Sequence, residues 1–333
     1  MSAFPSSLHD RISEDLDVVD LLTRSGQASG TLGEAVAYVL ERPGKRIRPR
    51  LCLSLAHSLA LPHNQCVTLA AAVELLHVAS LVLDDVQDND EMRRGRASVW
   101  RKFGRNSAIN VGTYFIAESL MLAATLPGLS PVFAAALRAA TVGQSTEGDF
   151  LGKIPTLTAY HAVAVGKTGA LFALPAQGAA VLAGCSDGEA ESIGRAYSML
   201  GAAYQIQDDL ADAFDRKGRA RAGLDLREGK ANSIVLCHLS LKPSDRTAFL
   251  AFQRDRAARA SGAQLDAWLD RLFASGAVAL AEEHLRQCCG DITIASTSLP
   301  APFAAHLSTL ATEMGGGIAS LRGPREVLSG CVL

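Results

Sequence analysis

Two copies of one acidic pattern interrupt segments that otherwise have the composition of buried helix, and this feature limits the possible folds more than any other. The copies are DDVQD at 84–88 and DDLAD at 208–212, and each follows a largely apolar run, at 69–83 and 197–207. Carboxylates in apolar surroundings are costly unless cations pair with them or metal ions neutralise them. Each copy therefore needs a positively charged partner.

Helical geometry indicates how such a partner would be held. Because a helix turns by about 100° per residue, positions i and i+4 share a face. Asp84 and Asp88 then point the same way, and Asp208 and Asp212 do likewise. Carboxylate oxygens suit magnesium, which keeps several waters and usually completes its shell with substrate phosphate oxygens. The pattern therefore predicts a magnesium diphosphate site.

Two polar residues extend these faces, and each acidic copy also has a simpler explanation. His77 lies two turns before Asp84, and Gln205 stands close to Asp208 and Asp212 in the second segment. A DDxxD string on a helix can also be a solvated acidic face or a partner of the helix dipole. A single copy would leave that alternative open. Two copies, each preceded by an apolar segment, favour the metal site.

Composition and charge exclude several classes of protein. The 333 residues carry a net charge of −2, and their mean hydropathy is +0.16. This charge gives no general attraction to nucleic acid, so we expect no nucleic-acid partner. The seven cysteines contain no CxxC pair and are expected to be core or surface thiols. We find no signal peptide and no uncharged apolar run of the roughly eighteen residues that a membrane span needs. We therefore expect a cytoplasmic protein without a transmembrane segment.

Helical periodicity dominates the chain, and the alternation typical of strands is nearly absent. We therefore expect an all-α fold, with one helical domain over residues 1–315 and a flexible, glycine-rich tail over 316–333. The expected helices span 13–23, 31–41, 50–60, 65–88, 107–124, 131–148, 158–183 and 188–213, and amphipathic segments follow after 232.

Four basic clusters complement the acidic copies. In the first cluster, Pro49 marks a helix start, and the cations around it form a natural anion site. Arginine forks suit bidentate contacts to phosphate, and a lysine inside an apolar helix, such as Lys167, needs a counter-ion. A charge run taken alone is more often a solvated face. The clusters are GKRIRPR at 44–50, RRGR at 93–96, GKTG at 166–169 and DLREGK at 225–230.

In order and spacing, these residues resemble the trans-isoprenyl diphosphate synthases, or polyprenyl synthetases, over roughly 44–236. The resemblance implies a helical bundle of the isoprenoid synthase type, usually a homodimer, with the acidic motifs facing each other across a deep central cavity. It implies a prenyltransferase that condenses isopentenyl diphosphate head-to-tail with dimethylallyl, geranyl or farnesyl diphosphate. The matching motifs are GKRIRP at 44–49, His77 through the first DDxxD, MRRG at 92–95, GQ at 143–144, KTG at 167–169, YQIQDDLAD at 204–212 and DLREGK at 225–230.

The resemblance also assigns individual residues to substrates and metals. It implies about three magnesium ions per active site, with manganese as a substitute. The residues for isopentenyl diphosphate would be Lys45, Arg48, His77 and Arg94. Those for the allylic diphosphate would be Arg93, Lys167 and Lys230. The metal residues would be Asp84 and Asp88 for two ions and Asp208 for the third, with Asp85, Asp209 and Asp212 close by through water. Thr168 and Gln205 would turn oxygens toward the developing carbocation and complete the catalytic set.

A few positions depart from the family pattern. Leu83 stands where many members have histidine. Ala220 stands where many have lysine, so either Arg219 or Arg221 replaces that contact or the contact is missing. The other departures are Trp100 and Asn232. None of these positions is an expected metal ligand, so we expect activity.

Residues before the first acidic motif are expected to set the product length. A helical rise of about 1.5 Å per residue puts Ala79 and Ser80 roughly 6 to 8 Å below Asp84. In the family that the chain resembles, bulky residues at these positions stop the product at farnesyl length. Both residues are small here, so the resemblance implies that a farnesyl chain passes. Tyr114 and Phe115 are the next candidates for a floor, which would give geranylgeranyl diphosphate (C20). If these aromatics are ordinary core, the product is longer, and a farnesyl product also stays open.

Three other functions stay open as alternatives. A class I terpene cyclase also uses an aspartate-rich helix and magnesium, but the cations at Lys45, Arg48 and Arg94 argue against it. An inactive regulatory partner subunit would keep the fold, but aspartates at all six motif positions oppose it. A simple ion-binding bundle would have no use for the basic clusters.

Overall fold

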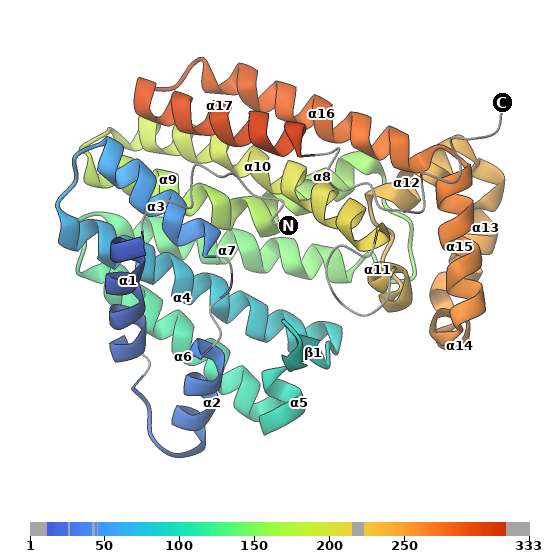
Figure 1. Cartoon of the computed structure of the whole chain (residues 1–333), viewed down its shortest axis with the longest axis horizontal. Coiled ribbons are helices and arrows are strands. Elements are labelled where there is room, and N and C mark those ends of the chain that lie inside the picture. Colours follow the sequence, from blue (N-terminus) through green and yellow to red (C-terminus); the bar gives the residue numbers. More distant parts are fainter. Residues whose placement is uncertain (1–11, 26, 42–43, 45, 215–222, 318–333) are drawn as a thin grey trace.

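The computed structural model describes residues 12–25, 27–41, 44, 46–214 and 223–317, and nearly all of their regular structure is helical (Figure 1). Lys45, the segment around Ala220 with Arg219 and Arg221, and the tail from 318 lie outside these residues. The predictions made for them, and the domain division at 315, therefore stay predictions.

The elements follow one another along the chain with short connections. The helices are α1 (Ile12–Ser25), α2 (Gly30–Leu40), α3 (Ile47–Ser58), α4 (His63–Asp88), α5 (Val99–Phe103), α6 (Arg105–Ala124), α7 (Leu129–Gly148), α8 (Leu157–Ala164), α9 (Ala170–Leu182), α10 (Asp187–Ala213), α11 (Leu224–Glu228), α12 (Ser233–Leu241), α13 (Arg246–Arg254), α14 (Arg256–Ala260), α15 (Gly262–Ala274), α16 (Ala277–Ser296) and α17 (Ala301–Gly316). A π-helical turn η2 (Val165–Gly169), a short 3₁₀ turn η3 (Pro243–Asp245) and the strands β1 (Met92–Arg93) and β2 (Arg96–Ala97) complete them.

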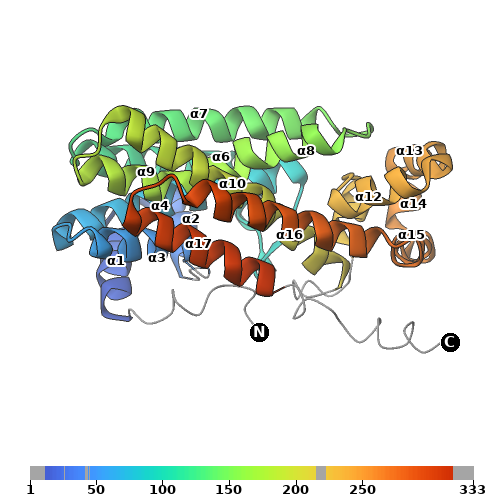
Figure 2. The ribbon, with the colours of Figure 1, turned by 90° about the horizontal axis from the view of Figure 1, so that it is seen from above.

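Helix α4 forms the centre of the core because its sequence offers apolar side chains nearly all round, which is typical of a buried helix. Leu69, Leu75 and Leu76 are almost completely buried, as are the alanines at 70–72. α4 packs against α3, α6 and α9, and α10 packs against α9 and α16. Figures 1 and 2 show α16 and α17 side by side, next to α10, with α13 to α15 gathered at one end.

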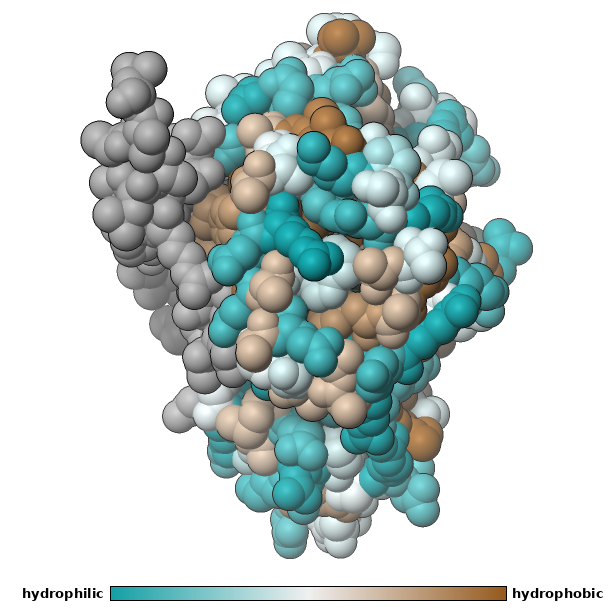
Figure 3. Space-filling model, turned by 90° about the vertical axis from the view of Figure 1, so that its right-hand side faces the viewer, coloured by the Kyte–Doolittle hydropathy of each residue, from teal (hydrophilic) through white to brown (hydrophobic). Residues whose placement is uncertain are grey.

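The two acidic motifs lie at the C-terminal ends of their helices, and these ends face the same way. Asp88 is the last residue of α4, and Asp212 lies one residue before the end of α10. In Figure 1 both helices run from left to right, and both end near α11. Helices α13 to α15 form the right-hand end of the molecule in Figure 1. The surface of this end carries both hydrophilic and hydrophobic side chains, and the hydrophobic ones are scattered (Figure 3).

The expected helices are confirmed within three residues of their bounds, apart from one interruption. The segment 158–183 is helical nearly throughout, but the π-helical turn η2 interrupts its α-helical pattern at the GKTG sequence and divides it into α8 and α9. Pro49 is the third residue of α3 and not its first. It still lies in the first turn, where backbone N–H groups have no partner within the helix and proline is tolerated.

The hairpin β1–β2 was not expected from the sequence. Met92 pairs with Ala97 and Arg93 with Arg96. Arg94 and Gly95 form the two-residue turn with φ angles of 52° and 75°, the conformation of the turns that suit tight hairpins. Strands of two residues are too short to show an alternating pattern, so the sequence contains no signal for them.

Two helices are apolar and long enough to cross a membrane, judged by length and composition alone. Neither is an uncharged run, because α4 contains Glu74 and α6 contains Glu118. In α4, 72% of the apolar window is buried inside the protein, as in the core helix of a folded domain. In α6 the share is 33%. One face of α6 lies on α4, where Ser119 Oγ donates to Ala72 O at 2.7 Å. Ile109 and Met121 are exposed, so α6 also has apolar side chains on its outer surface.

Candidate active site

Lys167 lies between carboxylates of two different helices. Its Nζ is 2.6 Å from Glu147 Oε2 of α7 and 3.6 Å from Asp84 Oδ2 of α4. Burial works to lower the pKa of Lys167, but Asp84 and Glu147 outweigh burial and raise it. Burial raises the pKa of Asp84, and Lys167 opposes that rise. The lysine inside the apolar segment therefore has the counter-ion that the sequence required.

Three glycines let the backbone of Lys167 reach this position. A β-carbon on Gly143 would lie 2.5 Å from the backbone nitrogen of Lys167, and one on Gly201 would lie 2.3 Å from that of Gly169. No real side chain fits at such distances, so the backbones of α7, η2 and α10 pack directly on one another. The π-helical turn occurs where α7 and α10 enclose it, and such turns are frequent at functional sites.

Lys230 pairs with the last aspartate of the first motif. Its Nζ donates to Asp88 Oδ2 at 2.8 Å and lies 3.0 Å from Glu228 Oε2. Burial works to lower the pKa of Lys230, but Glu228 and Asp88 raise it well above its usual value, so the amine stays charged. Burial raises the pKa of Glu228 to about 8, although Lys230 opposes that rise. The chain after α11 thus returns to the end of α4.

Arg93 binds the middle aspartate of the first motif from the hairpin. Its Nε donates to Asp85 Oδ1 at 2.7 Å, its Nη2 donates to the same oxygen, and Nη2 also donates to Asp90 Oδ2 at 3.1 Å. Burial raises the pKa of Asp85 to about 6, and Arg93 opposes that rise. Each aspartate of the first motif therefore contacts a different cation.

Aromatic residues of α2 and α5 fix the hairpin that carries Arg93. Tyr38 OH donates to Ala97 O at 2.8 Å, and the guanidinium carbon of Arg96 lies 3.9 Å from the centre of the Tyr38 ring. Trp100 Nε1 donates to Asp90 O at 2.8 Å. Trp100 thus has a structural role at a position where the sequence departs from the common pattern.

Arg48 and His77 form a second polar group, farther back along α4. Arg48 Nη1 donates to His77 Nε2 at 3.1 Å, and its guanidinium carbon lies 4.5 Å from the centre of the Phe172 ring. Burial, followed by the charges of Arg48 and Arg94, lowers the pKa of His77 well below its usual value. The imidazole is therefore neutral, as its acceptor role toward Arg48 requires.

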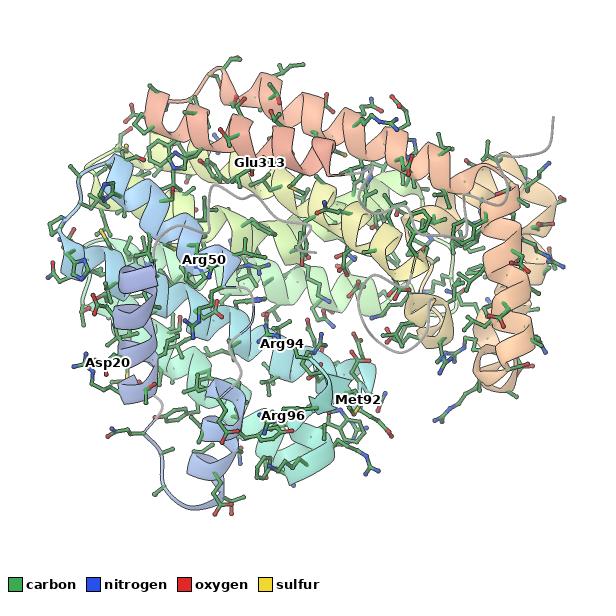
Figure 4. All side chains as sticks on the ribbon, viewed as in Figure 1. Asp20, Arg50, Met92, Arg94, Arg96 and Glu313 are labelled. Carbon is green, nitrogen blue, oxygen red and sulfur yellow. The ribbon has the colours of Figure 1, made fainter. Side chains whose placement is uncertain are left out.

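Arg94 brings the hairpin to the GKRIRP segment. A β-carbon on Gly44 would lie 2.1 Å from Arg94 Nη2, so the guanidinium rests directly on the glycine. In Figure 4, Arg94 lies nearer the middle of the molecule than Met92 or Arg96. Lys45, the neighbour of Gly44, lies outside the described residues.

The second motif is held in a different way from the first. Asp209 is 1% exposed and accepts hydrogen bonds from Tyr160 OH at 2.6 Å, from Gln205 Nε2 at 3.0 Å and from the Ser233 backbone N–H at 2.8 Å. These donors come from the three helices α8, α10 and α12. The place of Asp209 near a metal ion through water stays a prediction. In the structure the amide of Gln205 is turned toward Asp209.

The other two acids of the second motif differ in exposure. Asp212 is buried and accepts from the Asp225 backbone N–H at 3.2 Å. Asp208 is only partly buried, so it is the most accessible aspartate of this motif. Thr168 is partly buried in η2, next to Lys167. Asp208 is therefore the member of the second motif best placed to meet a ligand.

Comparison with known proteins agrees with this geometry. A family model described as Polyprenyl synthetase matches residues 29–265. The chain belongs to the polyprenyl synthetase family. It is 33% identical over 210 residues to the octaprenyl diphosphate synthase of Haemophilus influenzae, covering 62% of this chain and 64% of the relative. It is 32% identical over 216 residues to geranylgeranyl pyrophosphate synthase 2 of Gibberella fujikuroi, covering 62% of this chain and 55% of the relative. The chain thus spans less than two thirds of the length of these relatives.

A solved structure extends the likeness over nearly the whole chain. The polyprenyl synthase of Caulobacter crescentus CB15, complexed with calcium and isoprenyl diphosphate, matches with a TM-score of 0.81 at 23% identity. The match covers 95% of this chain and 99% of the other. It confirms the all-α fold expected from the sequence.

The acids of this polyprenyl synthetase fit a hard divalent cation that keeps part of its water. Within the described ranges, no three His, Cys, Asp or Glu side chains gather closely enough to hold a metal ion by themselves. Magnesium does not need such a cage, because one or two carboxylates, waters and substrate phosphates complete its shell. Glu228 lies next to Lys230, and its Oε1 is buried without a hydrogen-bond partner. This atom therefore offers one more oxygen for a bound molecule. The donor set therefore fits magnesium.

Sequence reasoning missed three residues of this site. Glu147 is one of the two counter-ions of Lys167, Glu228 is a counter-ion of Lys230, and Tyr160 binds Asp209. Glu147 could have been found, because it lies one helical turn after Gly143 and faces the same neighbour. Tyr160 has no such signal, since its partner lies on a helix far along the chain.

Raising the pH is expected to destabilise the metal-free protein between about pH 4 and pH 8. Burial raises the pKa of Glu228 to about 8 in the folded protein, above the unfolded value of about 4.3. Folding then favours the protonated acid, so its stabilisation is complete below about pH 4 and is lost as the pH rises through 8. Thermal unfolding in EDTA across this range checks the trend. Glu228→Gln should flatten part of the decline, and an unchanged slope would contradict this role of Glu228.

Proposed function

We propose that the protein is a trans-prenyl diphosphate synthase that condenses isopentenyl diphosphate head-to-tail with an allylic diphosphate. One observation carries the proposal, which is the division of the cations into two groups. Arg93, Lys167 and Lys230 each contact an aspartate of the first motif, whereas Arg48 lies at His77, two turns away. Two groups of cations suit two diphosphates, one at the metal-binding acids and one beyond them.

In this proposal Arg93, Lys167 and Lys230 bind the allylic diphosphate, and Arg48 and Arg94 bind isopentenyl diphosphate with His77. Bound magnesium would neutralise the diphosphate and so help it to depart. The three cations would stabilise the same departing charge, because they already lie in place before the reaction.

The remaining chemistry needs no nucleophile from the protein. Loss of diphosphate leaves an allylic carbocation, which the double bond of isopentenyl diphosphate attacks. Thr168 and Gln205 stay proposed as the residues nearest the developing cation, and the apolar core around α4 would exclude water. The proton lost at the end would pass to the released diphosphate.

We also propose about three magnesium ions per active site, replaceable by manganese, together with a homodimer and a cytoplasmic location. Asp84, Asp88 and Asp208 are the proposed metal ligands, and the motif-bearing C-terminal ends of α4 and α10 face the same way. The exposed apolar residues Ile109 and Met121 on the outer surface of α6 support contact with a second subunit.

The packing of α4 on α6 bears on product length. Leu83 fits against Gly112, where a β-carbon would lie 2.6 Å from Leu83 Cγ, and Ser119 binds Ala72 farther along. The two helices therefore run antiparallel, and positions between these contacts lie side by side. By interpolation, the turn of α6 around 115 lies beside the turn of α4 around 79.

Phe115, and not Tyr114, is then the candidate for the floor. Phe115 and Ala79 are completely buried. Tyr114 is partly exposed, and burial and the Glu118 carboxylate of its own helix raise its pKa. The small side chain of Ser80 donates to His77 O of its own helix at 2.8 Å. We propose geranylgeranyl diphosphate as the product, with Phe115 as the residue that stops the chain.

Geranylgeranyl diphosphate is expected as the main product of the unaltered protein, and longer chains are expected from Phe115→Ala. The smaller side chain would open space beside Ala79, whereas Tyr114→Ala, the matched control, should leave the product unchanged. Chromatography of the dephosphorylated products measures the product length of the unaltered protein and of each variant. A farnesyl product from the unaltered protein, or identical products from Phe115→Ala, would show that the floor lies elsewhere.

The activity itself is tested with labelled isopentenyl diphosphate and dimethylallyl, geranyl or farnesyl diphosphate at millimolar magnesium. We expect elongated products with at least one primer. No elongation with any primer would overturn the proposal and favour an inactive partner subunit. Conversion of an allylic diphosphate into hydrocarbon without uptake of isopentenyl diphosphate would favour a terpene cyclase.

A further inference from the structure

Asp209 is a buried carboxylate whose oxygens are occupied by groups of the protein. Oδ2 accepts from Tyr160 OH and from the Ser233 backbone N–H, and Oδ1 accepts from Gln205 Nε2. Three hydrogen bonds satisfy much of the accepting capacity of a carboxylate. They also stabilise its negative charge. The neighbouring Asp208 is more exposed, so the two adjacent aspartates have different surroundings.

Tyr160 is suited to be a permanent donor in this group. It lies on α8, whereas Asp209 lies on α10, and the bond between them is 2.6 Å long. Burial, followed by the charge of Asp209, raises the pKa of Tyr160 well above its usual value. The hydroxyl therefore keeps its proton at any pH at which the protein would work, and the bond is always available.

The third donor links Asp209 to the segment that carries Lys230. Ser233 is the first residue of α12, so its N–H is not used within the helix, and the helix dipole favours a carboxylate there. Asn232 caps the same helix by accepting from the Val235 N–H at 3.1 Å, and it donates to Asp225 Oδ2 at 3.0 Å.

Asp225 completes the connection between the two acidic motifs. Its backbone N–H donates to Asp212 Oδ2 at 3.2 Å, and its carbonyl accepts from the Lys230 backbone N–H at 2.8 Å. The Lys230 side chain then reaches Asp88 of the first motif. A continuous set of hydrogen bonds therefore runs from Tyr160 through Asp209 and the start of α12 to Lys230.

We propose that Tyr160 and Asp209 are a positioning pair, which fixes the segment 225–233 and thereby the place of Lys230, and that Asp209 itself binds neither metal nor substrate. The proposal rests on the proposed function only in assigning Lys230 to the allylic diphosphate. It separates Asp209 from Asp84 and Asp208, although all three belong to DDxxD motifs.

Tyr160→Phe removes only the hydroxyl and tests the pair. The matched control is Tyr197→Phe, because Tyr197 is also a buried tyrosine, which donates to Phe303 O at 3.0 Å away from the acidic motifs. Both variants should lower the unfolding midpoint to a similar degree. Only Tyr160→Phe should raise the KM for the allylic substrate, by about 10- to 100-fold, the usual effect of losing a residue that orients a site. The KM for isopentenyl diphosphate should not change.

Two further variants keep the test decisive if Tyr160→Phe folds poorly. Ser233→Pro deletes the N–H that binds Asp209 at a helix position where proline is favoured, and it should reproduce the change in the allylic KM. Asp209→Asn should leave the half-saturating magnesium concentration nearly unchanged, because the groups that bind Asp209 are different from the proposed metal ligands Asp84, Asp88 and Asp208. A large rise in that concentration would make Asp209 a metal ligand and overturn the proposal.

Amide hydrogen exchange of residues 223–233, measured without substrate, separates this inference from the proposed function. Faster exchange in Tyr160→Phe and Ser233→Pro, but not in Tyr197→Phe, supports the positioning pair even if the unaltered protein elongates no primer. Unchanged exchange in both variants, or equal effects on both KM values, would overturn it.

Discussion

Asp84→Asn and Asp208→Asn are each expected to lower turnover by about 10²- to 10³-fold while the protein stays folded. A bound metal ion supplies several kcal/mol of charge stabilisation, and each 1.4 kcal/mol or so is a factor of ten in rate. Asparagine nearly preserves the shape of aspartate but weakens coordination of a hard cation. Folding should not suffer, because burial already raises the pKa of Asp84 and so disfavours its charged form.

Steady-state kinetics across a magnesium titration, together with thermal unfolding, checks this expectation. Glu191→Gln is the matched control for Asp208, because Glu191 is an exposed acid of the same helix that pairs with Arg195, away from the acidic motif. This control should retain normal turnover. Near-normal turnover in Asp84→Asn or Asp208→Asn would show that the metal ions bind elsewhere.

Lys167→Met is expected to abolish most of the activity and to destabilise the protein. Lys167 contacts both Asp84 and Glu147, so its loss leaves two neighbouring carboxylates without their cation. Breaking a fully buried ion pair in this way costs about 3–5 kcal/mol. The three side chains are between 18% and 30% exposed, and water reduces the cost to about 1–2 kcal/mol. Denaturant unfolding and steady-state assays measure the two effects separately.

A second substitution separates the structural from the catalytic role of Lys167. In Lys167→Met with Glu147→Gln, one of the unpaired carboxylates is gone, so stability should recover while activity stays low. Glu147→Gln alone should keep measurable activity, because Lys167 still has Asp84. If activity recovers together with stability, Lys167 serves only to neutralise its neighbours and does not bind the substrate.

The sequence predicted the first motif well because local spacing determines its geometry. Asp84 and Asp88 lie one turn apart on a helix, and each meets a lysine that was already a candidate. The helix bounds could also be predicted, since long apolar segments bounded by glycine and proline leave few choices. The prediction of a metal site at Asp84 and Asp88 required only that the two carboxylates share one face of the helix, and their spacing of four residues ensures this.

The features that could not be predicted depend on contacts between distant segments. Asp209 and Asp208 are adjacent in the sequence, and only the positions of Tyr160 and Ser233 make their surroundings different. The turn η2 arises where glycines of α7 and α10 enclose the chain at Lys167. Likewise, Tyr114 and Phe115 are neighbours on α6, and only its packing on α4 shows which one is buried.

The most direct test of the account is a crystal structure with magnesium and an unreactive thio analogue of the allylic diphosphate. We expect the diphosphate to lie at the ends of α4 and α10, with magnesium on Asp84, Asp88 and Asp208 and with Arg93, Lys167 and Lys230 on the phosphate oxygens. Asp209 should keep its bonds to Tyr160 and Ser233. A diphosphate bound away from both motifs, or lysines that stay on their carboxylates with no metal between the helices, would contradict the account.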